Sequence, residues 1–181
     1  MKKKIIIVGG DPNSVNSEII YKAWRDQNKA NKNLMLIIGN YNLFVHQYKK
    51  LNIKIKINKL KKYNDYFDAK KINVLDLPLK FKDPFKVSVK HCSKYIIKSL
   101  NIAHKLAVEK KVKAIINCSI NKRLLSSSMK IGVTEFLASK CKVKTNSEIM
   151  MITNSQFSVV PLTTHIDVKE VARKIDQKLI I

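Results

Sequence analysis

The sequence predicts an α/β fold in which a mostly parallel sheet carries helices on both faces. Strand-like and helix-like patterns alternate along the chain, and this alternation is typical of the strand–helix–strand units that build parallel sheets. Of the 181 residues, 45% are apolar and only 4 are Gly and 4 are Pro. That apolar fraction is enough to form a hydrophobic core, so it excludes disordered and collagen-like chains. The length indicates one domain or slightly more.

The first half of the chain is expected to contain two strand–helix units and a less regular segment. Each unit begins with a buried aliphatic run that ends in glycine and continues with apolar residues at helical spacing: residues 5–8 and 19–24, then residues 34–38 and 43–51. Residues 58–86 follow no clear period. Pro78 and Pro84 there indicate a surface excursion, with one short strand at residues 72–75.

The second half continues the alternation. An amphipathic pattern from Val87 to Glu109 predicts a long helix. A buried strand is expected at residues 112–118, and the turn after it lies where α/β sheets gather their ligands. Four shorter elements are predicted beyond it: a helix at 134–140, strands at 149–153 and 157–161, and a helix at 168–178.

The formal net charge of +23 invites a nucleic-acid interpretation, but its distribution argues against one. Residues 1–90 carry 20 basic and 7 acidic side chains, and residues 91–181 carry 16 and 6, so no basic arm stands out. Only 3 residues are arginine, the side chain best suited to bidentate recognition of bases and phosphates. In the densest basic segment, residues 49–62, isoleucines alternate with lysines, which is typical of a half-buried strand with lysines facing water. We therefore expect no dedicated nucleic-acid interface.

No targeting or membrane segment is expected. The apolar run at residues 5–8 is too short for a signal peptide, and no later run approaches the ~18 residues that span a bilayer. Cys92, Cys118 and Cys141 have neither the spacing of a disulfide framework nor that of a zinc site. These features favour a cytoplasmic protein that binds no membrane.

Several residues are candidates for chemistry, although none is decisive by itself. The turn after the first strand is neither GxGxxG nor a P-loop; its Asn and Ser residues can cap a helix, and Asp11 is its one carboxylate before the helix. His165 is expected at a strand-to-helix junction, where an imidazole could ligate a metal. The segment that contains Val133 and Thr134 offers either a helix cap or an anion contact. His46, His91 and His104 are expected at the surface or its boundary.

Taken together and in order, five motifs resemble the 4-hydroxythreonine-4-phosphate dehydrogenases, the NAD-dependent enzymes of pyridoxal 5'-phosphate (vitamin B6) biosynthesis. The motifs span nearly the whole chain: IIVGGDP with SEII at residues 6–20, AII leading into INK at 114–122, GVTEFLA at 132–138, MM at 150–151 and LTTH at 162–165.

The resemblance implies an isocitrate- and isopropylmalate-dehydrogenase-like fold, a homodimer in the full-length form and a divalent metal (Zn, Mg or Co) held by three histidines. It further implies a small phosphorylated substrate, which is oxidised by NAD with help from the metal and then decarboxylated. By this resemblance His165 is the first metal ligand and Thr134 contacts the substrate phosphate. Asn121 and Lys122 lie on the family's strand-end turn, and Lys122 is a candidate catalytic residue.

The sequence also departs from the family pattern. Val133 stands where the family has a histidine that pairs with the threonine, and GDPNSVNSE replaces GDPxGIGPE. The family continues into a second half that carries the other two metal histidines and most NAD contacts. We therefore expect residues 1–181 to be the amino-terminal portion of a two-domain dehydrogenase, a fragment or a natural truncation, inactive alone and with an apolar face exposed. The alternatives are a dehydrogenase for another phosphorylated hydroxy acid and a non-catalytic binding module of the same fold.

Overall fold

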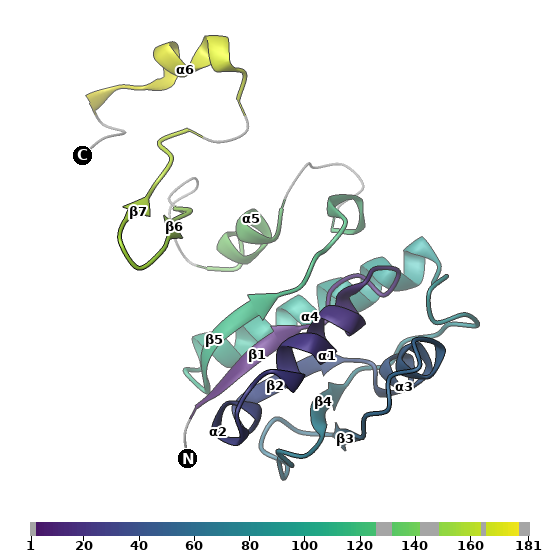
Figure 1. Ribbon diagram of the computed structural model, residues 1–181. Helices are drawn as coiled ribbons and strands as arrows, with labels where there is room; N and C mark the ends of the chain where they lie inside the picture. The colour runs from purple at the N-terminus through teal and green to yellow at the C-terminus, as the bar shows by residue number, and fades with distance from the viewer. Residues whose placement is uncertain (1–2, 126–131, 142–148, 164–165, 178–181) are drawn as a thin grey trace. The chain divides into compact units, whose positions relative to one another are not determined.

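The computed structural model describes residues 3–125, 132–141, 149–163 and 166–177, which fall into two compact units (Figure 1). The first unit covers Met1–Lys140 and the second Cys141–Ile181. The predicted sheet and its large helices all belong to the first unit.

The first unit is built on a parallel five-stranded sheet in the order β3-β4-β2-β1-β5 (Figure 1). Its strands are β1 (Lys4–Val8), β2 (Met35–Gly39), β3 (Ile57–Leu60), β4 (Ile72–Asp76) and β5 (Val112–Asn117). This arrangement confirms the predicted fold class.

Helices cover both faces of the sheet. On one face lie α1 (Asn16–Arg25) and α3 (Tyr41–Lys50), and on the other lies α4 (Val89–Val108) (Figure 1). The side chains of β1 show the division, because Ile6 and Val8 join the core cluster under α4 whereas Ile7 joins the one under α1 and α3. Successive residues of a strand point to opposite faces, so each strand supplies both clusters.

The remaining elements are short. In the first unit they are α2 (Lys29–Lys32), the 3-10 turn η1 (Lys122–Leu124) and α5 (Val133–Ala138). In the second unit β6 (Ile152–Thr153) and β7 (Ser158–Val159) pair antiparallel, and α6 (Val168–Lys174) follows.

Three expectations need correction. The strand near residue 72 is not part of a surface excursion: β4 lies between β2 and β3, and its residues Ile72 to Leu75 are buried. In the basic segment Ile53, Ile55 and Ile57 do pack inward, but strand pairing begins only at Ile57. Helix α1 is capped by Val15, which makes no side-chain cap bond, because the polar residues expected there form other contacts described below.

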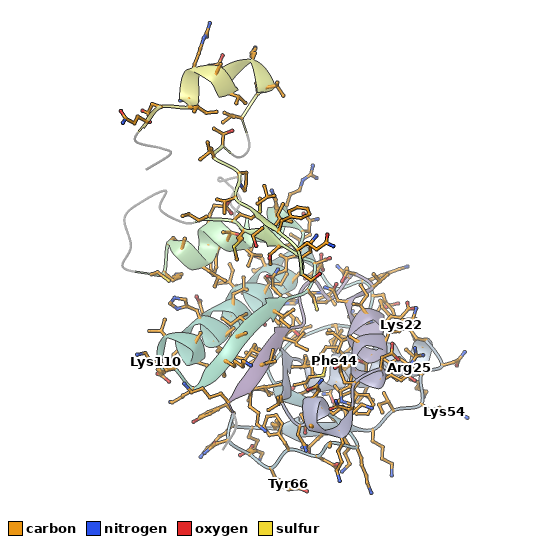
Figure 2. The ribbon with its side chains drawn as sticks, turned by 60° about the vertical axis from the view of Figure 1, so that its left-hand side comes forward. Lys22, Arg25, Phe44, Lys54, Tyr66 and Lys110 are labelled. Carbon is orange, nitrogen blue, oxygen red and sulfur yellow. The ribbon has the colours of Figure 1, made fainter. Side chains whose placement is uncertain are left out.

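The surface of the first unit is rich in lysine. Figure 2 shows Lys22, Lys54 and Lys110 projecting outward, whereas Phe44 lies inside. His46 is exposed and His91 and His104 are half-buried, as predicted. Within the described ranges, no helix is both long and apolar enough to cross a membrane.

The central strand β2 gives a direct test of the core. Leu36 is fully buried there, so Leu36→Ala should lower the free energy of unfolding by about 2–5 kcal/mol, through lost apolar burial and the cavity left behind. Urea unfolding followed by circular dichroism measures the change. Val108→Ala, at a position 63% exposed on α4, serves as the control and should change it by less than about 0.5 kcal/mol. Equal effects of the two substitutions would contradict the assigned core.

Candidate active site at the carboxyl edge of the sheet

The loops that leave β1 and β5 lie side by side, because these strands are parallel neighbours. Gly10 makes this proximity possible: its φ is +72°, and a Cβ there would lie 2.6 Å from the carbonyl oxygen of Ser119. Glycine is favoured at such a position because it has no side chain to clash. The close approach of the two loops therefore depends on Gly10.

Asn16 ties the two loops together. Its buried side-chain Nδ2 donates to the Ser119 carbonyl oxygen at 2.8 Å and to the Gly9 carbonyl oxygen at 3.2 Å. The backbone N–H of Asp11 also donates to the Ser119 carbonyl oxygen, at 3.1 Å. A buried carbonyl needs a donor, and here a residue expected to be a helix cap supplies it.

Two more amide side chains fix the other side of the β1 loop. Asn13 and Val87 exchange two hydrogen bonds, of 2.8 Å from Asn13 Nδ2 to the Val87 carbonyl and of 2.7 Å from the Val87 N–H to Asn13 Oδ1. Gln47, which is buried on α3, donates to the carbonyl oxygens of Pro12 and Pro84 at 2.7 and 2.8 Å. The loop after β1 is thus held by α3, by the segment before α4 and by the loop after β5.

The ends of β2 and β4 are joined in the same way. Asn40 caps α3 by accepting from the N–H of Leu43 at 2.8 Å, and its Nδ2 donates to the Leu77 carbonyl at 2.6 Å. The buried hydroxyl of Tyr95 accepts the N–H of Asn40 at 3.0 Å. Burial raises the pKa of this tyrosine above its usual value, so it stays protonated.

The structure brings Lys122 close to the start of α5. The Lys122 Cε lies 3.9 Å from the position a Cβ would take on Gly132, the residue that caps α5. Lys122 and Thr134 are both exposed, whereas Val133 is half-buried and packs against the core cluster under α4. Asn121 turns inward to its own chain, with its Oδ1 accepting the Arg123 N–H at 3.1 Å. A cationic and a hydroxyl side chain therefore stand on neighbouring loops, open to solvent.

Asp11 belongs to the same edge. Its Oδ1 accepts the N–H of Asn13 at 2.9 Å, and its negative charge adds to burial in raising the pKa of the Cys92 thiol to about 11. His165, the predicted metal ligand, lies outside the described residues. Among the residues that are described, no three His, Cys, Asp or Glu side chains gather closely enough to hold a metal ion. A metal would need ligands beyond that set.

Sequence reasoning did not identify the bridging roles of Asn13, Asn16 and Gln47. One signal was available for Gln47, which occupies a position on the apolar stripe of its helix, where a buried amide needs hydrogen-bond partners. The partners of Asn13 and Asn16 lie 74 and 103 residues away in the chain, so no local pattern reports them.

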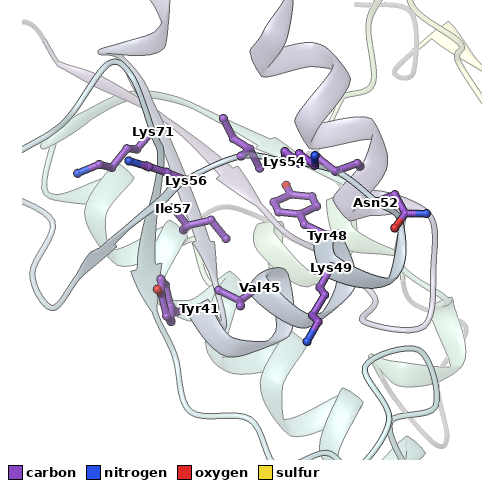
Figure 3. A pocket seen from close by; sticks show the side chains of 11 residues that line it. Tyr41, Val45, Tyr48, Lys49, Asn52, Lys54, Lys56, Ile57 and Lys71 are labelled. Atoms are coloured by element: carbon purple, nitrogen blue, oxygen red, sulfur yellow. The ribbon is translucent and has the colours of Figure 1, made fainter.

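A separate cleft of about 630 Å³ lies between α3 and the extended segment that leads into β3 (Figure 3). Tyr41, Val45 and Tyr48 line it from α3, and Lys54 and Lys56 line it from the segment. Burial raises the pKa of the Tyr48 hydroxyl well above its usual value. None of the carboxyl-edge side chains described above lines this cleft, so we do not include it in the candidate site.

Comparison with known proteins shows what these loops belong to. The model of the family described as pyridoxal phosphate biosynthetic protein PdxA matches residues 31–181. The chain belongs to the PdxA family. The resemblance found in the five motifs is thereby confirmed.

Curated PdxA-type relatives resemble the chain over nearly all of it. A protein of Sulfurihydrogenibium sp. (strain YO3AOP1) named 4-hydroxythreonine-4-phosphate dehydrogenase is 31% identical, over 98% of this chain and 54% of its own length. A protein of Oceanobacillus iheyensis named for D-threonate 4-phosphate dehydrogenase activity is 30% identical, over 91% of this chain and 51% of its own length. The chain spans about half the length of the curated relatives it matches.

Solved structures show the same relationship. The 4-hydroxythreonine-4-phosphate dehydrogenase of Burkholderia phymatum matches with a TM-score of 0.82 and 26% identity, over 99% of this chain and 55% of its own. The enzyme of that name from Klebsiella pneumoniae, 22% identical, has a TM-score of 0.79 over 99% of this chain and 56% of its own and supports the fold.

The Asn16 bridge can be tested by a near-isosteric change. Asn16→Asp removes the amide donor and leaves the Ser119 and Gly9 carbonyls without it, so the free energy of unfolding should fall by about 1–3 kcal/mol. Asn101→Asp makes the same chemical change at an exposed position of α4 and is the control. Urea midpoints that fall equally in both variants would show that the bridge contributes nothing specific.

The cysteines give a second test of the local environment. Burial raises the pKa of both Cys92 and Cys118 to about 11, so at pH 8 only about 0.1% of each is thiolate. Iodoacetamide should therefore modify the exposed Cys141 first, and the two others should become reactive as the pH rises toward 11. Peptide mass spectrometry over a pH series reads each site; rapid modification of Cys118 at pH 8 would contradict its assigned burial.

Proposed function

We propose that this chain is the amino-terminal portion of an NAD-dependent dehydrogenase that oxidises the hydroxyl of 4-hydroxythreonine 4-phosphate for pyridoxal phosphate biosynthesis. The observation that carries the proposal is the family match over residues 31–181, together with the curated relative that is similar along 98% of the chain. The oxidised product would then lose CO2, as the family resemblance implies.

The carboxyl edge of the sheet supplies the substrate side of this proposal. The Lys122 ammonium and the Thr134 hydroxyl are exposed on neighbouring loops, and both suit a phosphorylated substrate, one as a cation and one as a hydrogen-bond donor. The loops around them are preorganised by buried amides, so little ordering is needed when the substrate binds. Lys122 is also placed to move a proton at the substrate hydroxyl, as its candidate catalytic role requires.

NAD would accept the hydride, and a divalent metal would polarise the oxidised hydroxyl. His165 would contribute one metal ligand. The described residues provide no further cluster for it, so the remaining ligands would come from the part of the family's length that this sequence does not include. For the same reason we propose that the chain alone is inactive, and that the complete enzyme is a cytoplasmic homodimer.

The substrate itself has a close competitor. The names of the two relatives above contain 4-hydroxythreonine 4-phosphate and D-threonate 4-phosphate, which share a 4-phosphate and an oxidisable hydroxyl. Val133, where the family has a histidine, removes one donor near the phosphate and favours a related substrate over an identical one. Comparing kcat/KM for the two compounds distinguishes these candidates.

The proposal is tested by following NADH absorbance with 4-hydroxythreonine 4-phosphate, NAD and a divalent metal. Two proteins are compared: this chain alone, and this chain continued by the part of the Sulfurihydrogenibium relative that it does not cover. We expect activity in the continued form only, and its loss in His165→Ala. Folded protein that oxidises neither phosphorylated substrate in the continued form would favour the non-catalytic module.

In the active form, Thr134→Val should raise KM for the phosphorylated substrate about tenfold and leave KM for NAD unchanged, because one hydrogen bond to an anion is lost. Thr153→Val, at an exposed threonine in the second unit, is the control. Initial rates at varied substrate concentrations measure both constants. An unchanged KM in Thr134→Val would remove this residue from the phosphate site.

A further inference from the structure

The edge strand β5 is unlike every other strand of the sheet in its exposure. Strand β2 is buried along its whole length, whereas in β5 Ala114 is exposed and Ile116 is 52% exposed. Parallel strands normally have both faces covered by helices. Helix α4 covers β5 on one face, with Val112 and Ile115 packed into its cluster. On the other face, Ile116 remains open.

An apolar cavity of about 380 Å³ lies at this open face, between β5 and α1. Ile5, Leu34 and Cys118 line it from the sheet and its flanking loops, Ile116 from β5, and Ile19 and Ala23 from α1. Ile19 is itself 50% exposed. Two large aliphatic side chains thus border a hollow that an apolar side chain would fill.

The free backbone edge of β5 adjoins the cavity. In the described part of the chain, β5 pairs with β1 only. The Cys118 N–H donates to the Val8 carbonyl, and backbone groups alternate in direction along a strand, so those of Ile115 and Asn117 point away from β1. An added strand would find hydrogen-bond partners there.

The opposite edge of the sheet has no such surface. Strand β3 carries Lys59, which is ion-paired to Asp76 at 3.0 Å, and none of its apolar residues is strongly exposed. Charged edge strands resist the addition of further strands. The contrast makes β5 the edge built to be covered.

We propose that the β5–α1 surface docks the carboxyl-terminal part of a PdxA-family chain, which adds a strand to β5 and an apolar helix over Ile116 and Ile19. The relatives match this chain over 51–54% of their own length, so they hold nearly as much chain again that must pack somewhere. A second copy of this chain is disfavoured as the occupant because both copies would carry a net charge of +23. The inference rests on family membership and on this surface, and requires no catalytic activity.

The test uses the uncovered carboxyl-terminal part of the Sulfurihydrogenibium relative as a separate polypeptide. Maleimide labelling of Ile116→Cys, read by peptide mass spectrometry, should slow at least about tenfold when the polypeptide is added. Labelling of Tyr66→Cys should not change, because Tyr66 is 84% exposed on the β3–β4 connection, beside the opposite edge of the sheet (Figure 2).

Affinity provides the second measurement. Ile116→Asp should weaken binding of the polypeptide at least about tenfold in calorimetry, since a charge would enter the apolar contact, whereas Tyr66→Asp should leave it unchanged. Both positions are exposed in this chain, so both variants should keep the parent's unfolding temperature. Absence of binding, or binding that protects neither Ile116→Cys nor Cys118, would overturn the proposal. Protection that grows with the concentration of this chain alone would overturn it in favour of a second copy.

Because the readouts are labelling and affinity, they separate this inference from the proposed function. Docking without dehydrogenase activity would support the surface and count against the enzyme. Activity of the continued chain with an unprotected Ile116→Cys would do the reverse.

Discussion

A parallel strand must bury both of its faces, and most of this molecule follows from that constraint. β1 and β2 satisfy it by sending alternate aliphatic side chains into two separate clusters, one under α4 and one under α1 and α3. With both faces closed, the only free places are the ends and the edges of the strands. The candidate site occupies the carboxyl ends, and the open docking surface occupies one edge.

The carboxyl edge shows how a family site can keep its shape after its usual glycines are replaced. In this chain the turn after β1 retains Gly10, which alone has the positive φ in that turn, and amide side chains hold the rest. Asn13, Asn16 and Gln47 each connect this turn to a segment distant in sequence. The sequence GDPNSVNSE thus replaces flexible residues by residues that carry their own hydrogen bonds.

Much of the fold could be predicted because it is periodic. Strands such as 5–8 and 34–38, and the long helix near residues 87–109, announce themselves by spacing and lie within a few residues of their observed bounds. The position of β4 inside the sheet could not be predicted, because strand order depends on long-range pairing that no local pattern reports. For the site, the motifs did indicate that Lys122 and the residues around Thr134 belong together, whereas the buried role of Asn16 required its partner 103 residues away.

The buried groups that brace the candidate site are mainly amides, namely Asn13, Asn16, Asn40 and Gln47. Amides do not titrate in the range where enzymes work, and the one buried phenol among them, Tyr95, stays protonated. The frame of the site therefore carries no proton switch. Any pH dependence in its chemistry would report the reacting groups themselves, such as Lys122 or a bound phosphate, and not a rearrangement of the scaffold.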